Sequence, residues 1–172
     1  MSTKKIARTI LILLILVSNI GCDQFSKTLV RQNVGALEEI SLIHNYVTLM
    51  NIENSGAFLS LGHSMPQPIK VVVLMVLPLL ALGVALFLLF TRNNLTSLSI
   101  GGMSFIVGGG IGNIYDRIVH GSVTDFLHID FGIFETGIFN MADVSILTGM
   151  LMVLADLYFN RTFPLFDEVK KN

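Results

Sequence analysis

Two aspartates, Asp125 and Asp143, are of the type and in the surroundings that acid–base chemistry requires. In residues 123–131 apolar and polar side chains alternate as in a β-strand, and Asp125 has the parity of Leu127 and Ile129. We therefore expect Asp125 on the apolar face, where a carboxylate is costly unless something there uses it. Asp143 is the other acid placed to enter the same region. Two carboxylates that lie close together share a proton, so one can take a proton from water while the other polarises a carbonyl group.

Each aspartate also has a purely structural interpretation. Asp125 can accept hydrogen bonds from backbone N–H groups in a turn. Asp143 can cap the helix that follows it, because Asp is favoured at helix starts. The spacing of the two residues does not decide between a catalytic pair and two caps.

Further polar residues are spaced so that each pair shares one face of a helix. They are Asp23 with Lys27, Asn113 with Arg117, and Asn140 with Asp143. All six lie at similar depth near one end of apolar segments, where polar groups are costly unless paired or hydrated. Asp23 and Lys27 alone are also consistent with a local ion pair that anchors a helix. Three such pairs on separate segments predict a shared polar site.

Other chemistries have weaker support. The sequence contains no Gly-x-Ser-x-Gly motif, and the single cysteine, Cys22, has no histidine nearby in sequence. The spacing of His120, His128 and Asp130 matches no zinc motif, and the latter two are expected on the solvated face of their strand. We therefore expect neither a metal nor a cofactor.

The elements that must position these residues are membrane helices. Of 172 residues, 52% are hydrophobic and only 13% are charged, and the mean hydropathy is +0.72. A soluble domain carries about a quarter charged residues. Eleven Lys and Arg against twelve Asp and Glu leave no basic field for nucleic acid. Residues 71–90 are twenty residues without a polar side chain, enough to cross a hydrocarbon core of about 30 Å.

We predict one domain, residues 1–172, with an all-α membrane core of four spans at about 9–30, 69–91, 95–115 and 139–160. The uncharged core of the last span, residues 144–155, is only twelve residues long. It crosses the membrane only if Asp143 and Asp156 lie near opposite faces. Ser104, Gly108 and Gly112 form a stripe of small residues at four-residue spacing, which favours close helix packing.

The distribution of basic residues predicts the orientation. Seven Lys and Arg residues would lie on the side of both termini and four on the other side, which places both termini in the cytoplasm. Segments 31–67 and 116–138 are then extracytoplasmic. Both contain patterns typical of strands, at residues 47–52 and 123–131.

The N-terminus has a second interpretation. Basic residues, an apolar run and Gly21-Cys22 are also typical of a signal peptide that ends at a lipidated cysteine. Asn19 stands where such a signal has an apolar residue, and three further spans follow. We therefore favour a retained helix in which Cys22 packs against another helix.

Five blocks in order along the chain carry a resemblance to a known family. They are DQFSK at 23–27, NSGA at 54–57, GNIYDR at 112–117, GSVTDF at 121–126 and FNMAD at 139–143. With them the chain resembles the bacterial lipoprotein signal peptidases (signal peptidase II), membrane aspartyl proteases that remove signal peptides from prolipoproteins. The blocks cover nearly the whole chain.

The resemblance implies roles for named residues. Asp125 and Asp143 become the catalytic pair. The groups that bind substrate or support its cavity are Asn54, Gly56, Asn113, Arg117, Asn140, Asp23 and Lys27. Many relatives have Gly-Ala-Ala-Phe where this chain has Gly56-Ala57-Phe58-Leu59, so a role of Phe58 in covering the substrate is left open.

The resemblance also implies the substrate and the location. The substrate is a diacylglyceryl-modified prolipoprotein, cut in the bacterial inner membrane on the N-terminal side of its lipidated cysteine. We expect the protein to act as a monomer. The expected partners are this substrate and membrane lipid, without nucleic acid. Two alternatives remain: a non-catalytic membrane module that binds a partner helix, and a lipoprotein anchored through Cys22.

Overall fold

The computed structural model describes residues 3–36, 38–44, 46–56 and 65–160. The elements in chain order are α1 (Thr3–Asn33), β1 (Ile40–Ile43), β2 (Val47–Asn54), α2 (Gln67–Val71), the π-helix η2 (Val72–Val76), α3 (Leu77–Thr91), α4 (Ser97–His120), β3 (Val123–Ile129) and α5 (Met141–Asn160). Helices α2, η2 and α3 are continuous. The described part of the chain thus contains four helices long and apolar enough to cross a membrane. With the small sheet, they confirm the predicted fold class.

Several helix ends lie beyond the predicted spans, whereas α4 and α5 each begin two residues later than predicted. The first runs over Thr3–Asn33 instead of residues 9–30, and α4 continues to His120. An apolar run marks the part of a helix in lipid, whereas backbone hydrogen bonding continues into the polar flanks. Helix α4 ends at Gly121, whose φ of 78° is the left-handed conformation that glycine adopts at low cost.

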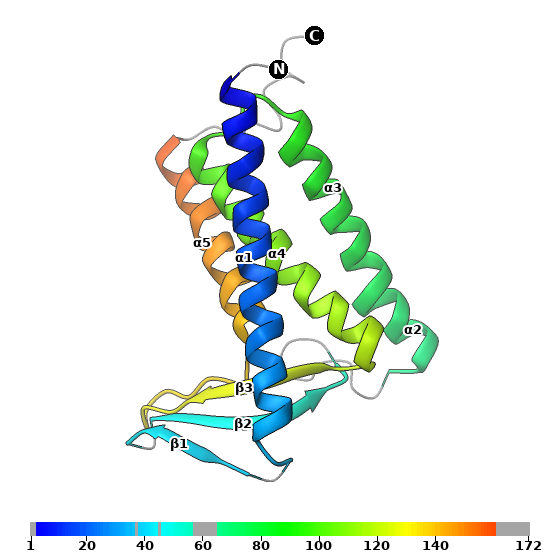
Figure 1. Cartoon of the computed structure of the whole chain (residues 1–172), viewed down its shortest axis with the longest axis vertical. Coiled ribbons are helices and arrows are strands. Elements are labelled where there is room, and N and C mark those ends of the chain that lie inside the picture. The colour runs from blue at the N-terminus through cyan, green and yellow to red at the C-terminus, as the bar shows by residue number, and fades with distance from the viewer. Residues whose placement is uncertain (1–2, 37, 45, 57–64, 161–172) are drawn as a thin grey trace.

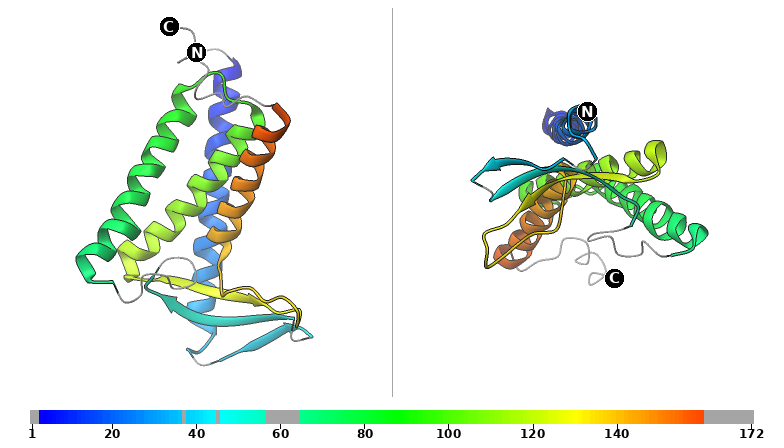
Figure 2. Two further views of the ribbon diagram at one scale, coloured as in Figure 1. Left: turned by 180° about the vertical axis from the view of Figure 1, so that it is seen from behind. Right: turned by 90° about the horizontal axis from the view of Figure 1, so that it is seen from below.

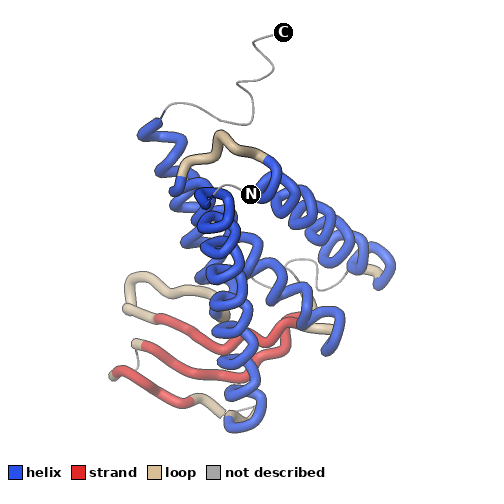
Figure 3. Tube along the Cα trace, turned by 45° about the horizontal axis from the view of Figure 1, so that its top comes forward, coloured by secondary structure: helices blue, strands red, loops and turns tan. Residues whose placement is uncertain are grey.

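Helix α4 is the centre of the bundle (Figure 1). In the most apolar stretch of α4, 61% of the residues are buried within the protein. The corresponding share in the other three membrane helices is 11–22%. It lies inclined against α1 and α5 and contacts α3, which stands apart from them (Figure 2). The start of α1 and the end of α5 lie at one end of the bundle. The sheet crosses the other end (Figure 3).

Glycines allow α4 to approach its neighbours closely. A Cβ on Gly108 would lie 2.9 Å from Asn19 Cβ on α1, and one on Gly112 would lie 2.5 Å from the Asp23 carboxylate. On another side of α4, a Cβ on Gly109 would overlap the backbone carbonyl of Ala142 on α5. The predicted packing stripe is confirmed, and a second glycine face of α4 packs closely against α5.

The sheet is antiparallel, in the order β1-β2-β3, and strands β2 and β3 confirm both strand predictions. Val47 pairs with Ile129 and Asn54 with Val123. The end of α1 packs on this sheet, where Val30 of α1 and Val34, just after the helix, cluster with Phe126 of β3. The sheet is therefore held against the membrane helices.

Thr124 and Cys22 pack in ways that local pattern does not show, and the expectation for Cys22 is wrong. Thr124 of β3 shares its parity with His128 but is fully buried, because the end of α1 covers it and Arg31 Nε donates to Thr124 Oγ1 over 2.7 Å. Cys22 is exposed on α1 and does not pack between helices. The helix turns its Asp23 and Lys27 face to the bundle instead.

Asp143 and Asp156 lie at opposite ends of the last helix, as a crossing by that span requires. Asp143 lies in the first turn of α5, and that helix begins near the sheet (Figure 1). Asp156 lies at the other end of that helix. There it accepts hydrogen bonds from Thr96 and Ser99, over 2.8 and 2.5 Å, at the start of α4.

Candidate active site

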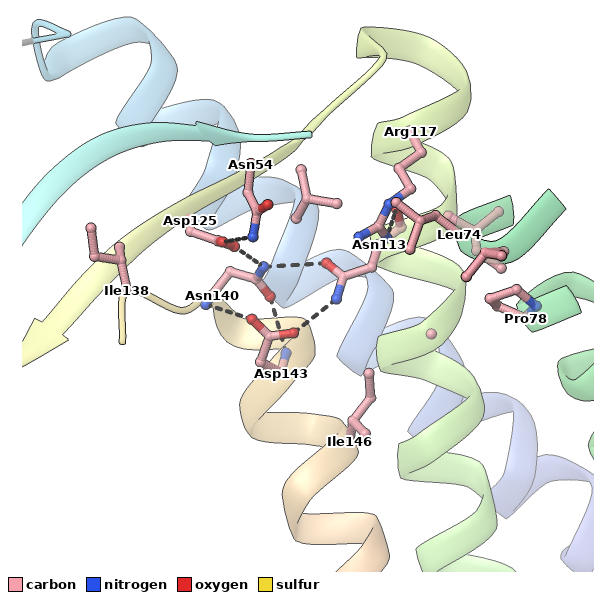
Figure 4. A pocket seen from close by; sticks show the side chains of 14 residues that line it. Asn54, Leu74, Pro78, Asn113, Arg117, Asp125, Ile138, Asn140, Asp143 and Ile146 are labelled. Carbon is pink, nitrogen blue, oxygen red and sulfur yellow. Dashed lines mark hydrogen bonds between the residues drawn. The ribbon is translucent and has the colours of Figure 1, made fainter. Parts of the chain in front are cut away.

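The two candidate aspartates come from different elements that the chain folds back together. Asp125 lies on β3, and Asp143 lies in the first turn of α5 (Figure 4). The segment between them returns to β3, because the backbone carbonyl of Phe139 accepts hydrogen bonds from the N–H groups of Phe126 and Leu127, over 3.0 and 2.9 Å. The next residue, Asn140, is thereby set beside Asp125.

Asn140 and Asp143 form a reciprocal cap at the start of α5. The Asp143 N–H donates to Asn140 Oδ1 over 3.0 Å, and the Asn140 N–H donates to Asp143 Oδ2 over 3.1 Å. The N–H of Ala142, another unpaired donor of the first turn, is bound by Asp23 Oδ1 at 2.9 Å. Asp143 therefore does act as a helix cap, as its structural interpretation predicted, while its side chain also lines a cavity.

Amide groups connect the two carboxylates. Asn140 Nδ2 donates to Asp125 Oδ1 over 2.6 Å, and it also lies 3.2 Å from Asn113 Oδ1. Asn113 Nδ2 donates to Asp143 Oδ1 over 2.9 Å, and Asn54 Nδ2 donates to Asp125 Oδ2 over 2.8 Å. Both oxygens of each carboxylate are thus held by neutral donors in fixed positions.

These side chains line a cavity of about 340 Å³, which is within the usual size range of small ligand sites. Its polar wall carries Asn54, Asn113, Arg117, Asp125, Asn140 and Asp143. The facing wall is apolar and includes Val73 and Leu74 of η2 and Pro78 of α3 (Figure 4). Pro78 has no N–H with which to bond the turn before it, which accounts for the irregular helix at this wall.

Burial raises the pKa of Asp125 from 3.8 to about 6. The nearby Asp143 carboxylate also raises it, whereas the hydrogen bonds from Asn54 and Asn140 lower it. A carboxyl with this pKa carries a proton for a useful fraction of the time near neutral pH. That property suits one member of a proton-sharing pair.

Arg117 and Gly56 form the other end of the polar wall. The Arg117 guanidinium donates to the backbone carbonyls of Gly56 and Asn113, over 2.9 and 3.3 Å. Gly56 does not line the cavity, but its N–H donates to Asn54 Oδ1 over 2.9 Å and so orients the Asn54 amide toward Asp125. Arg117 Nε is buried without a hydrogen-bond partner among the described residues. It is a donor that a bound peptide carbonyl could use.

Asp23 and Lys27 lie behind this wall and not in it. Lys27 is fully buried, and its Nζ lies 2.8 Å from Asp23, 2.9 Å from Asp116 and 2.9 Å from Asn113 Oδ1. Because Lys27 occupies the oxygen of the Asn113 amide, the amide nitrogen is turned toward Asp143. Arg31 adds a second cation 3.1 Å from Asp116.

Sequence reasoning missed the buried role of Asp116. The sequence did contain an indication of this role. Asp116 lies in the same block as Asn113 and Arg117, and it follows Asn113 by three residues, so the two side chains share one face of a helix. The predicted sites thus fall into three groups: six in the cavity wall, Gly56 directly behind it, and Asp23 with Lys27 in the buried ion network. Phe58 lies outside the described residues.

The residues considered for a metal do not form one group. His120 lies beside Arg31, with Nε2 3.1 Å from the guanidinium. His128 and Asp130 gather instead with Glu135 on the sheet, outside the cavity, with ligand atoms within 4.8 Å of one another. Exposed acidic groups are common without a metal, so the expected absence of a metal stays a prediction.

Comparison with known proteins gives concordant matches. A sequence profile described as signal peptidase (SPase) II matches residues 13–159. Proteins named lipoprotein signal peptidase are similar over most of the chain. The one from Chlorobium luteolum is 34% identical over 160 residues, covering 88% of this chain and 92% of its own. The one from Desulforapulum autotrophicum is 34% identical over 163 residues, covering 94% and 98%.

Two solved structures of bacterial membrane enzymes share the fold. Both are 20% identical to this chain, with TM-scores of 0.78 and 0.75. The first match covers 88% of this chain and 89% of the other, and the second covers 85% and 91%. The helical bundle with its small sheet is therefore an arrangement that experiment has seen in other membrane enzymes.

Proposed function

Because the chain belongs to the signal peptidase II family and is therefore a membrane peptidase, we propose that it removes signal peptides from prolipoproteins with Asp125 and Asp143 as its catalytic pair. One observation carries the proposal. Asn140 donates through its side chain to Asp125 and through its backbone to Asp143, at the wall of a cavity. Both carboxylates thus face one space from fixed positions.

In the proposed mechanism the pair begins with one shared proton. Asp125, whose pKa is raised to about 6, holds it, and Asp143 accepts a proton from water as that water attacks the scissile carbonyl. Asp125 gives its proton to the carbonyl oxygen, which yields a tetrahedral diol. As the C–N bond breaks, Asp143 passes its proton to the leaving nitrogen and Asp125 takes one back from the diol. The pair returns to its starting state without a cofactor.

The remaining cavity groups are proposed to bind the peptide. Arg117 Nε, buried without a partner among the described residues, can donate to a peptide carbonyl. Asn54, Asn113 and Asn140 keep the carboxylates in place. The apolar wall from η2 and α3 suits the hydrophobic part of a signal peptide entering from the lipid.

The substrate is proposed to be a diacylglyceryl-modified prolipoprotein, cut on the N-terminal side of its lipidated cysteine. Four apolar helices and the family fit a protein of the bacterial inner membrane. With both termini in the cytoplasm, as the basic residues predict, the sheet and the cavity lie at the outer face. We propose that a monomer carries out the cleavage, because every group in the mechanism comes from one chain.

The test is cleavage of a diacylglyceryl-modified prolipoprotein by the purified protein in lipid. Asp125→Asn and Asp143→Asn keep side-chain size and most hydrogen bonding, and we expect each to lower cleavage at least 10²-fold, the usual contribution of general acid–base catalysis. Cys22→Ala is the control, since Cys22 is exposed on α1 away from the cavity. Circular dichroism and elution volume establish that each variant is folded.

Each outcome decides between functions. Activity retained in either aspartate variant removes that residue from the mechanism. Wild-type protein that binds the precursor without cutting it favours the module that holds a partner helix. An intact mass that lacks residues 1–21 and carries lipid favours the anchored lipoprotein.

A further inference from the structure

The start of α1 and the end of α3 lie at the end of the bundle opposite the sheet (Figure 1). A second cavity is lined by residues at these two helix ends. Its volume is about 170 Å³. The lining residues are Lys5, Arg8, Thr9, Ile12, Leu89, Phe90, Thr91 and Asn93. None of them takes part in the candidate active site.

The cavity is positively charged. Lys5 and Arg8 line it, and no acidic side chain does so among the residues that the structure describes. Arg8 donates through one guanidinium nitrogen to the backbone carbonyl of Leu89, over 2.6 Å. That carbonyl is among the last of α3, so the contact fixes the Arg8 guanidinium at the cavity and leaves further N–H donors for a ligand.

Other polar groups of the lining are also available. Within the described ranges, the side chains of Lys5, Thr9 and Asn93 make no hydrogen bond to another residue. The cavity therefore offers two cations, together with a hydroxyl and an amide group that are not hydrogen-bonded to the described residues. Such a set suits a ligand that is anionic and rich in oxygen acceptors. A phosphate group has this chemistry.

The floor of the cavity has the opposite character. Ile12 and Leu89 are fully buried beneath it, while Phe90 is 48% exposed at its edge. Both α1 and α3 are membrane helices, so their ends place the cavity at the interface between headgroups and hydrocarbon. The volume is below the range of about 300–1,000 Å³ typical of sites that enclose a whole ligand. It therefore suits one end of a larger molecule whose remainder lies in the bilayer.

We propose that this cavity binds the phosphate headgroup of an anionic membrane phospholipid. Lys5 and Arg8 contact the phosphate, Thr9 and Asn93 contact its oxygens, and the acyl chains leave past Phe90. Basic pockets between membrane helices are a known type of anionic-lipid site. The lipid would join α1 to α3 where, in the described structure, Arg8 provides the hydrogen bond between the two helices.

The test measures lipid bound to the purified full chain by native mass spectrometry. We expect phosphatidylglycerol to be retained in preference to phosphatidylethanolamine. Lys5→Gln should weaken phosphatidylglycerol binding roughly fivefold, the effect of about one cation near an anionic lipid surface. Arg8→Gln should weaken it at least as much. Because Arg8→Gln also removes the bond to Leu89, Lys5→Gln is the decisive variant.

Lys4→Gln is the matched control. It removes the same charge from the neighbouring residue, and the Lys4 side chain does not line the cavity. Equal weakening by Lys4→Gln and Lys5→Gln would mean diffuse attraction and would overturn the proposal, as would equal retention of the two lipids. Inorganic phosphate forms the last arm. If it raises the melting temperature of the wild type as much as phosphatidylglycerol does, and fails to do so with Lys5→Gln, the ligand is free phosphate and not lipid.

Discussion

Asn140 and Asp143 cap each other at the start of α5, because the backbone N–H of each donates to a side-chain oxygen of the other, over 3.1 and 3.0 Å. The amide nitrogen that Asn140 does not need for this cap binds Asp125 at 2.6 Å. The same residue therefore starts the helix and sets the relative positions of the two proposed catalytic carboxylates. Substitution can separate these two roles.

Replacing Asn140 by alanine should reduce both stability and activity. Asn140→Ala removes the cap acceptor, at a cost of about 0.5–2 kcal/mol in the free energy of unfolding, and removes the donor to Asp125. Asn140→Ser keeps a capping oxygen but lacks the amide nitrogen. We expect serine to recover most of the stability and little of the cleavage rate, measured by thermal unfolding and precursor cleavage. Recovery of both by serine would show that the amide contact to Asp125 is dispensable.

The pH dependence of cleavage should reflect Asp125. Burial is the main cause that raises its pKa to about 6, so a pair that needs one proton loses activity as the pH rises through that value. The hydrogen bond from Asn54 lowers this pKa. Asn54→Ala should therefore raise it and shift the alkaline decline of kcat/KM to higher pH, besides lowering the rate.

The matched control for that profile is Glu135→Gln, which removes an exposed carboxylate outside the cavity. It should leave the position of the decline unchanged. A shift toward lower pH in Asn54→Ala, or an equal shift in Glu135→Gln, would contradict the assignment to Asp125.

A methyl group on Gly109 should separate α4 from α5. The added Cβ would overlap the carbonyl of Ala142 and lie 2.9 Å from Ile146, so Gly109→Ala should destabilise the protein by about 1–3 kcal/mol and reduce cleavage by displacing Asp143. Gly83→Ala is the control, because a Cβ on Gly83 meets nothing within 4 Å. That change should be neutral or slightly stabilising in a helix. Thermal unfolding in detergent compares the two, and equal melting temperatures would refute the close packing.

Asp156 should matter for stability and not for chemistry. Asp156→Ala leaves the hydroxyls of Thr96 and Ser99 without their acceptor, at a cost of about 1–3 kcal/mol. Asp156→Asn retains an acceptor oxygen and should be milder. At a temperature where all forms are folded, the turnover per folded molecule should match the wild type. A lower turnover with intact folding would indicate communication along α5.

Much of the architecture follows from the sequence because lipid imposes simple rules. Uncharged runs such as residues 71–90 define spans, and the small residues of α4 indicate its packing faces. Strand parity placed Asp125 on a buried face, where it is 5% exposed. These signals depend on local periodicity, which a sequence displays directly.

The incorrect or missing predictions depend on contacts between distant segments. Parity alone does not show that Thr124 is buried, because it does not reveal that the end of α1 covers the sheet. Asp116 was passed over because its partners, Lys27 and Arg31, lie far away in the chain. Cys22 was expected to pack against a helix because it is small, but it is exposed. The buried ion pair of Asp23 and Lys27 determines which face of α1 is turned to the bundle.

The contact between Asp23 and Ala142 joins residues that are 119 positions apart. The ribosome makes α1 early and α5 after every other described element, so the nascent chain carries Asp125 for some time before Asp143 enters the membrane. During that interval Asp23 on α1 has not yet received the hydrogen bond from the Ala142 N–H in the first turn of α5. If the proposed pair performs the reaction, proteolysis begins only when synthesis has passed α5, and fragments released earlier by a stalled ribosome are inert.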